Sequence, residues 1–239
     1  MSRGFVTFIN NNQKYKDLLS VMIDSMLRLT NEDIEVFSLN RAYENTTGSS
    51  RVSVVQVKHE REDFAQICYT KLLAGAKCSF DEAVMLDADM VLTPHAIRLF
   101  DEIDLTSDVP YASLHPQDPN NQAPLMKHLG VKRKTQPYVH ASFLFSRNSQ
   151  DFLQECYDIS QSMPPKTRLD HNYDETILNV MLWKYEKTHS LVDTYDPYFG
   201  HFFDLNNQFR KNSRGYVCHG CKDVELAKRI LARIEDGDY

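Results

Sequence analysis

Asp87 and Asp89 are the residues of this 239-residue chain whose type and spacing point most directly to chemistry. They follow the apolar residues 83–86 and precede the apolar residues 90–92, so they stand at the end of a predicted buried strand. Open α/β sheets bind ligands beyond the carboxyl ends of their strands, and Mg²⁺ or Mn²⁺ takes carboxylate oxygens together with water and substrate phosphate. The pair therefore predicts a site for a divalent metal that binds a diphosphate. Aspartates that form turns or cap helices are the alternative.

Cys218 and Cys221 form the only C-x-x-C pair among the five cysteines of the chain. A structural zinc site would require a second pair, which the sequence does not contain. Free thiols are therefore the favoured interpretation, and zinc binding or redox chemistry at this pair is the alternative.

Composition and charge limit the class of protein. The chain is long enough for one large domain or two small ones, and we expect a single domain over residues 1–239. The net charge of -6 argues against a nucleic-acid partner, because phosphate contacts need a basic surface. The sequence has no signal-peptide core and no apolar run of about 18 residues, so we expect a cytoplasmic protein without a transmembrane segment.

The first half of the chain alternates strand and helix patterns that would place the aspartates at the edge of a sheet. Apolar residues recur at helical spacing over 14–29, and a second helix over 64–76 leads into the strand before Asp87. Three further strands are predicted over 5–10, 34–39 and 52–57. This order predicts an α/β domain with a mostly parallel sheet.

The second half is less regular. Strands are predicted over 111–114 and 140–145, separated by a polar, proline-containing loop over 115–138 that is long enough to be functional. Helices are predicted over 152–159, 174–185 and 224–234.

Four segments of the chain, taken in order, are similar to the motifs of one enzyme family. They are GFVTFINNNQKY at 4–15, CYTKLLAGAKCSFDEAVMLDADMVLT at 68–93, YDETILN at 173–179 and CHGCK at 218–222. Together they resemble the family 8 glycosyltransferases of the GT-A fold, the family of glycogenin. The family pattern has glutamine where this chain has Glu175, and Asn-Ser-Gly where this chain has residues 139–142.

The resemblance implies an α/β fold in a single GT-A domain, Rossmann-like, with a mostly parallel central sheet flanked by helices. Residues 1–110 would form the nucleotide-binding half and residues 111–239 the acceptor-side half. The resemblance also implies a metal-dependent enzyme that transfers a sugar from a nucleotide-sugar donor, a UDP-sugar, to a hydroxyl of a glycan or glycoprotein acceptor. Its cofactor would be Mn²⁺ or Mg²⁺, and transfer would retain the anomeric configuration.

The resemblance further implies roles for individual residues. The metal ligands would be Asp87, Asp89 and His219, with Asp89 holding the ion more directly than Asp87 and with His201 as the competing histidine. Lys71 and Lys222 would neutralise the developing charge of the leaving diphosphate together with the metal. The residues that bind the donor would be Thr7, Phe8, Asn10, Asn11, Tyr15, Arg61, Lys71, Asp87, Ala88 and Lys222.

Asp174 and Glu175 would be the catalytic pair, close to the anomeric carbon. Their negative charge would stabilise an ion-pair-like transition state in retaining transfer. A carboxylate in place of the family's amide also allows a general base for inverting transfer. The ordinary alternative is a pair of acidic residues that stabilise a helix N-terminus.

Two other classes of protein remain open at this point. One is a protein that binds nucleotide sugars or glycans without catalysis. The other is a nucleotidyltransferase, which usually has a glycine-rich phosphate loop where this chain has Asn10-Asn11-Asn12.

Overall fold

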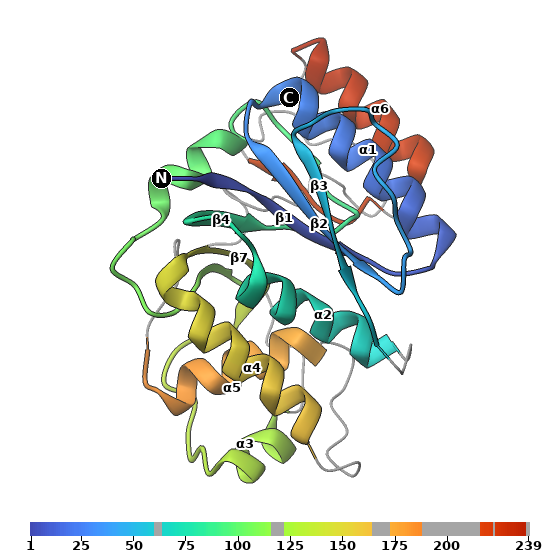
Figure 1. The fold of residues 1–239 in the computed structure, drawn as a ribbon. Helices are drawn as coiled ribbons and strands as arrows, with labels where there is room; N and C mark the ends of the chain where they lie inside the picture. Colours follow the sequence, from blue (N-terminus) through green and yellow to red (C-terminus); the bar gives the residue numbers. More distant parts are fainter. Residues whose placement is uncertain (60–63, 116–121, 164–172, 188–215, 222, 238–239) are drawn as a thin grey trace.

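A six-stranded sheet in the order β3-β2-β1-β4-β7-β6 forms the centre of the computed structural model (Figure 1). The structure describes residues 1–59, 64–115, 122–163, 173–187, 216–221 and 223–237. The strands are β1 (Arg3–Ile9), β2 (Asp33–Leu39), β3 (Val52–Val57), β4 (Glu82–Met85), β6 (Tyr111–Leu114) and β7 (Val139–Ser146). Pairing among β1, β2, β3 and β4 is parallel, whereas β7 is antiparallel to both β4 and β6. The predicted α/β class and mostly parallel sheet are confirmed.

The central strands are apolar on both faces because helices cover both sides of the sheet. On β1, Phe5 and Ile9 pack with helix α1 (Gln13–Leu29), whereas Val6 packs on the opposite face with helix α2 (Phe64–Lys77). Successive side chains of a strand point to opposite faces, so a strand covered on both sides needs a nearly continuous apolar run. The same alternation places Thr7 on the α1 face, where it is fully buried.

Two groups of helices flank the sheet (Figure 1). Helices α1 and α6 (Val224–Glu235) pack together on one side, and α2, α4 (Gln150–Ser162) and α5 (Tyr173–Lys184) pack together on the other. Gly75 allows α4 to approach α2 closely, because a Cβ atom there would lie 2.7 Å from Cδ1 of Leu153. In the described part of the chain, no helix combines the length and apolar character needed to cross a membrane.

The prediction of a plain loop over 115–138 is wrong in one part. Helix α3 (Ala123–Leu129) lies there, with Pro124 in its first turn and Gly130 in a left-handed conformation at its end. Leu125 is the only buried residue of this short helix, so its apolar pattern is too brief to reveal it.

A second, two-stranded sheet joins β5 (Val91–Leu92) to β8 (Val217–Cys218), which was not predicted. Strands of this length are too short for an alternating pattern to identify. Two short 3₁₀ helices, η1 (Ala96–Glu102) and η2 (Arg147–Ser149), complete the described elements.

Candidate active site

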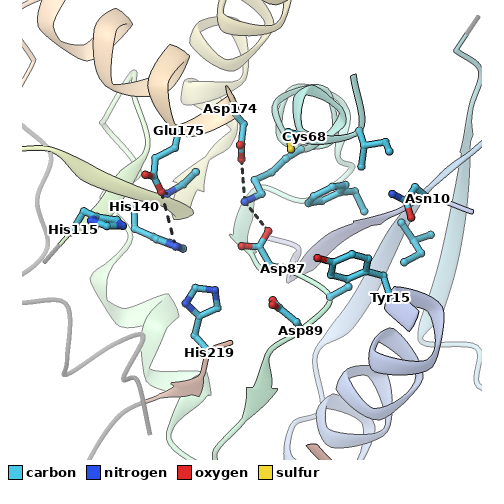
Figure 2. Close-up of a pocket in the computed structure, with 16 residues that line it drawn as sticks. Asn10, Tyr15, Cys68, Asp87, Asp89, His115, His140, Asp174, Glu175 and His219 are labelled. Carbon is cyan, nitrogen blue, oxygen red and sulfur yellow. Dashed lines mark hydrogen bonds and ion pairs between the residues drawn. The ribbon is translucent and has the colours of Figure 1, made fainter. Parts of the chain in front are cut away.

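A cavity of about 370 Å³ lies at the carboxyl ends of β1 and β4 (Figure 2). Residue 10 follows β1 and residues 87–89 follow β4, at the position where open α/β sheets bind ligands. The residues that line the cavity are Phe8, Ile9, Asn10, Tyr15, Ile67, Cys68, Lys71, Asp87, Ala88, Asp89, His115, His140, Ala141, Asp174, Glu175 and His219. All four sequence segments that resemble the glycosyltransferase motifs therefore contribute to one cavity.

Lys71 joins two carboxylates within this cavity. Its Nζ lies 2.6 Å from Oδ1 of Asp87 and 3.0 Å from Oδ2 of Asp174, and only 6% of the Lys71 side chain is exposed. Burial lowers the pKa of the Lys71 ammonium, but the charges of Asp174 and Asp87 raise it more strongly, so its pKa lies above the ordinary value. Lys71 is thus a permanent positive charge that holds the loop after β4 to the first turn of α5.

His219 reaches the cavity through the two-stranded sheet. Val91 of β5 pairs with Cys218 of β8, and the backbone N–H of Cys221 donates to the carbonyl of Asp89 at 3.0 Å. These contacts hold His219 beside the loop that contains Asp87 and Asp89. Gly220, the next residue, has a φ of +82°, a left-handed conformation that is strained for any residue with a side chain.

Asp87, His140 and His219 offer metal-ligand atoms that lie within 4.8 Å of one another. Carboxylate and imidazole ligands suit Mn²⁺ and several other divalent cations. His140 fits least well, because its Nδ1 accepts a hydrogen bond from the N–H of Ser142 at 3.0 Å. The imidazole proton then resides on Nε2, whereas a metal binds an unprotonated ring nitrogen. Asp87 and His219 are therefore the better ligands of the three, and Asp89 lines the same cavity.

His140 and Glu175 face each other from β7 and α5 (Figure 2). Oε2 of Glu175 accepts a hydrogen bond from the N–H of Ala141 at 3.1 Å and lies 3.9 Å from Nε2 of His140. The His140 ring stacks on His115, with centroids 6.0 Å apart and an interplanar angle of 17°, and meets the His219 ring at 4.9 Å. Main-chain and ring contacts on several sides therefore fix the position of the His140 side chain.

His115 and His140 line the cavity but lie outside the sequence motifs that predicted the other site residues. His115 directly follows a predicted strand, so the rule that led to Asp87 applies equally to it. His140 lies within β7, and the only signal for it was the departure of residues 139–142 from the family pattern.

The residues predicted to bind the donor fall into three groups. Six of them line the cavity, namely Phe8, Asn10, Tyr15, Lys71, Asp87 and Ala88. Asn11 lines an adjoining cavity of about 490 Å³, which Asn10 and Tyr15 also line. Thr7 lines neither cavity, because alternation along β1 turns it to the face opposite Phe8. Arg61, Lys222 and the competing metal ligand His201 lie outside the described residues.

The thiols of Cys218 and Cys221 are core groups in the described structure. Both are fully buried against α1 and α6, and Sγ of Cys221 lies 3.8 Å from the carbonyl oxygen of Cys218. Burial raises the pKa of both thiols, so neither is a thiolate near neutral pH. Neither cysteine forms a disulfide. That the thiols are also free of zinc stays a prediction.

No family model matches the chain, and no curated protein sequence matches it significantly. One solved structure that does match is the crystal structure of LgtC, a family 8 glycosyltransferase, as an active-site mutant with glutamate in place of glutamine. The TM-score is 0.61 at 16% sequence identity, and the match covers 98% of this chain and 95% of the LgtC chain. At this identity the likeness concerns the fold. The chain thus has the GT-A fold of this family 8 glycosyltransferase.

Proposed function

We propose that the chain is a glycosyltransferase that uses Mn²⁺ or Mg²⁺ to transfer a sugar from a UDP-sugar to a hydroxyl of a glycan or glycoprotein acceptor. The observation that supports this most is the convergence of Asp87, Asp89 and His219 at the carboxyl ends of the sheet strands of a GT-A fold. The N-terminal half would bind the nucleotide, and the half beginning at residue 111 would face the acceptor.

The donor set in the cavity fits a divalent cation. Asp87 and His219 present a carboxylate and an imidazole at metal-ligand separation, and Asp89 adds a second carboxylate to the cavity. These three residues would hold the ion. When bound, the ion would neutralise charge that develops on the leaving diphosphate.

The nucleotide would extend from this cavity into the adjoining one. The two cavities share Asn10 and Tyr15, and Asn11 lies in the second. Side-chain amides and an aromatic ring can bind a uracil and its ribose by hydrogen bonding and stacking. Burial raises the pKa of Tyr15, as do the nearby charges of Asp89 and Asp87. The Tyr15 hydroxyl therefore stays protonated and can donate a hydrogen bond to the nucleotide sugar.

For Lys71 we infer a positioning role. Its ammonium is shared between Asp87 and Asp174, so a contact with phosphate would require it to leave one of them. Lys71 would hold the metal-binding loop and the start of α5 in fixed relative positions. Its positive charge would still raise the electrostatic potential at the diphosphate and so stabilise the negative charge there.

Retention is the stereochemical outcome that we propose. Asp174 is bound to Lys71, which disfavours a role for Asp174 as the general base of an inverting reaction. Glu175 is the residue that would act as such a base if transfer inverted. Anomeric NMR of the product tests this directly, and a product of inverted configuration would overturn the proposal of retention.

The main test measures UDP binding by calorimetry with and without Mn²⁺, and UDP release from UDP-glucose and UDP-galactose. We expect Mn²⁺-dependent binding that Asp87→Asn weakens by about 10-fold or more. Asp101→Asn, an exposed aspartate in η1, is the control and should bind as the unaltered chain does. Lack of UDP binding in the presence of Mn²⁺ would contradict the proposal, and binding without turnover would favour a non-catalytic nucleotide-sugar-binding protein.

A further inference from the structure

The segment between α3 and β7 is strongly basic in a chain that is acidic overall. Residues 122–139 contain Lys127, Lys132, Arg133 and Lys134 and no aspartate or glutamate, whereas the whole chain has a net charge of -6. All four of these basic residues are exposed. The segment belongs to the half of the chain that would face the acceptor, and these four residues do not line the candidate active site. Their charge therefore indicates an anionic ligand other than the nucleotide.

Two adjoining cavities lie beside this basic segment. The first, of about 320 Å³, is lined by residues of the segment 130–135 and by Trp183 and Glu186 at the end of α5. The second, of about 380 Å³, is lined by the same segment and Glu186. Trp183 is almost fully buried, and its indole N–H donates to the carbonyl of Gln136 at 3.0 Å. The basic segment is thus attached to a core residue of α5.

The contacts of the basic side chains leave their charge at this surface. Nζ of Lys134 lies 5.3 Å from the centroid of the Trp183 ring, a cation–π contact that positions the ammonium without neutralising it. Arg133 lies 3.7 Å from Glu186, and these side chains are 78% and 69% exposed. An exposed pair of this kind contributes little, so Arg133 can exchange Glu186 for an anionic ligand at small cost. Its guanidinium can bind a carboxylate or sulfate through two N–H groups.

The surface fits a glycan better than a membrane. Membrane-binding surfaces combine basic residues with exposed apolar side chains. In the part of the chain that the structure describes, the large apolar side chains that are exposed are Met1, Leu105 and Tyr185, and none of them lines either cavity. The hydroxyl of Tyr185 donates to the carboxylate of Glu155, so this ring end is already bound to an acidic group.

Helix α5 connects this surface to the candidate active site. Asp174 in its first turn lines the active-site cavity, and Trp183 in its last turn lines the basic one. At a rise of about 1.5 Å per residue, these two positions lie about 13 Å apart along the helix axis. This separation is within the length of a short oligosaccharide.

We propose that the basic surface, defined by Lys132, Arg133, Lys134 and the two cavities beside them, binds an acidic glycan. This inference rests on the proposed glycosyltransferase function and specifies the class of its acceptor. The acceptor is an oligosaccharide that carries carboxylate or sulfate groups, which this surface binds at a distance from the reacting hydroxyl. The surface selects the acceptor and takes no part in donor binding.

The test compares acidic with neutral oligosaccharides of equal length. Calorimetry at low and high salt measures the binding of tetragalacturonate, a heparin tetrasaccharide and the neutral maltotetraose. Vesicles of phosphatidylcholine with phosphatidylglycerol test the membrane alternative, and UDP with Mn²⁺ tests the donor site. The surface variant combines Lys132→Gln, Arg133→Gln and Lys134→Gln. The matched control removes the same charge from exposed residues of α2 and α6, and it combines Lys77→Gln, Lys228→Gln and Arg229→Gln.

We expect the unaltered chain and the control to bind both acidic tetrasaccharides alike, and the surface variant to bind them about 10-fold or more weakly. High salt should weaken this binding, because it screens exposed charges. Maltotetraose should bind more weakly than the acidic tetrasaccharides do, and with the same affinity for all three chains. The three chains should bind UDP with Mn²⁺ within about twofold of one another, since the surface lies outside the donor site. Thermal unfolding confirms that each variant is folded.

The possible failures are distinguishable. If no chain binds UDP with Mn²⁺, the proposed function fails, and the assignment of an acceptor to this surface fails with it. If UDP binds but neither acidic tetrasaccharide does, or if the surface variant binds them as tightly as the control, only this inference is overturned. Tighter binding of maltotetraose would also overturn it. Vesicle binding that the surface variant loses, without binding of the tetrasaccharides, would overturn it in favour of a membrane surface.

Discussion

The two walls of the cavity hold their charged and polar side chains in different ways. On one wall, Lys71 binds Asp87 and Asp174 at hydrogen-bond distance, so one buried cation is shared by two carboxylates. On the other wall, His140 and Glu175 are each held by a main-chain N–H of β7 and stop 3.9 Å short of each other. A buried ion network of this kind stabilises the site, whereas the second wall holds its two side chains at a fixed separation. The contrast predicts that removal of the shared cation Lys71 affects mainly stability, whereas changes at the second wall affect mainly binding.

The largest effect is expected from Lys71→Met, which would leave Asp87 and Asp174 close together without their shared cation. Removal of one partner from a buried ion pair costs about 3–5 kcal/mol in the free energy of unfolding. Lys77→Met is the matched control, because Lys77 is exposed at the end of the same helix. Urea unfolding measures both variants. A loss of less than about 1 kcal/mol in Lys71→Met would show that the contacts of Lys71 with Asp87 and Asp174 contribute no more than an exposed salt bridge does.

The next largest effect is expected from His219→Ala, whose ring contacts that of His140 on the second wall. We expect Mn²⁺ affinity to fall by about 10-fold or more, because one of the proposed ligands is removed, while the free energy of unfolding changes little. His128→Ala, at an exposed histidine of α3, serves as the control. Calorimetric titration with Mn²⁺ in the presence of UDP gives the affinity, and unchanged metal dependence would exclude His219 as a ligand.

A smaller effect is expected from Gly220→Ala, which leaves the ligand in place but strains the backbone beside it. The left-handed φ should cost about 1 kcal/mol of stability and displace His219, with a few-fold loss of Mn²⁺ affinity. Gly48→Ala is the control, because Gly48 has a φ of +71° and a Cβ atom there would meet no other atom within 4 Å, as at Gly220. If both variants lose the same stability and neither loses metal affinity, Gly220 has no part in placing the histidine.

The smallest effect is expected at Cys218 and Cys221, which lie in the apolar core against α1 and α6. Buried thiols whose pKa is raised react slowly. In the folded protein a disulfide reagent should therefore modify Cys218 and Cys221 only as fast as the protein unfolds, whereas in urea it should modify them rapidly. EDTA should not change the labelling rate. Rapid labelling after EDTA, together with zinc in the purified protein, would restore the zinc alternative.

Local patterns in the sequence determined many of the strands and helices and the place of Asp87. The apolar run of β1 and the periodicity of α1 predicted both elements within a few residues, because each depends on the spacing of side chains along a short stretch of chain. The position of Asp87 after a buried strand likewise predicted its place at the edge of the sheet. Thr7 was assigned to the donor site on resemblance alone, and the alternation of side chains along β1 turns it to the other face of the sheet.

The tertiary structure decided which of these residues meet. Lys71 was predicted to contact phosphate, but the packing of α2 against α5 places its ammonium between Asp87 and Asp174. His219 lies beside Asp87 because β8 pairs with β5, and Thr93 bonds Tyr216 across 123 residues of sequence. The opposition of His140 and Glu175 depends on how β7 and α5 pack. Such contacts join segments that are far apart in the chain, and no local spacing records the pairing of strands or the packing of helices that creates them.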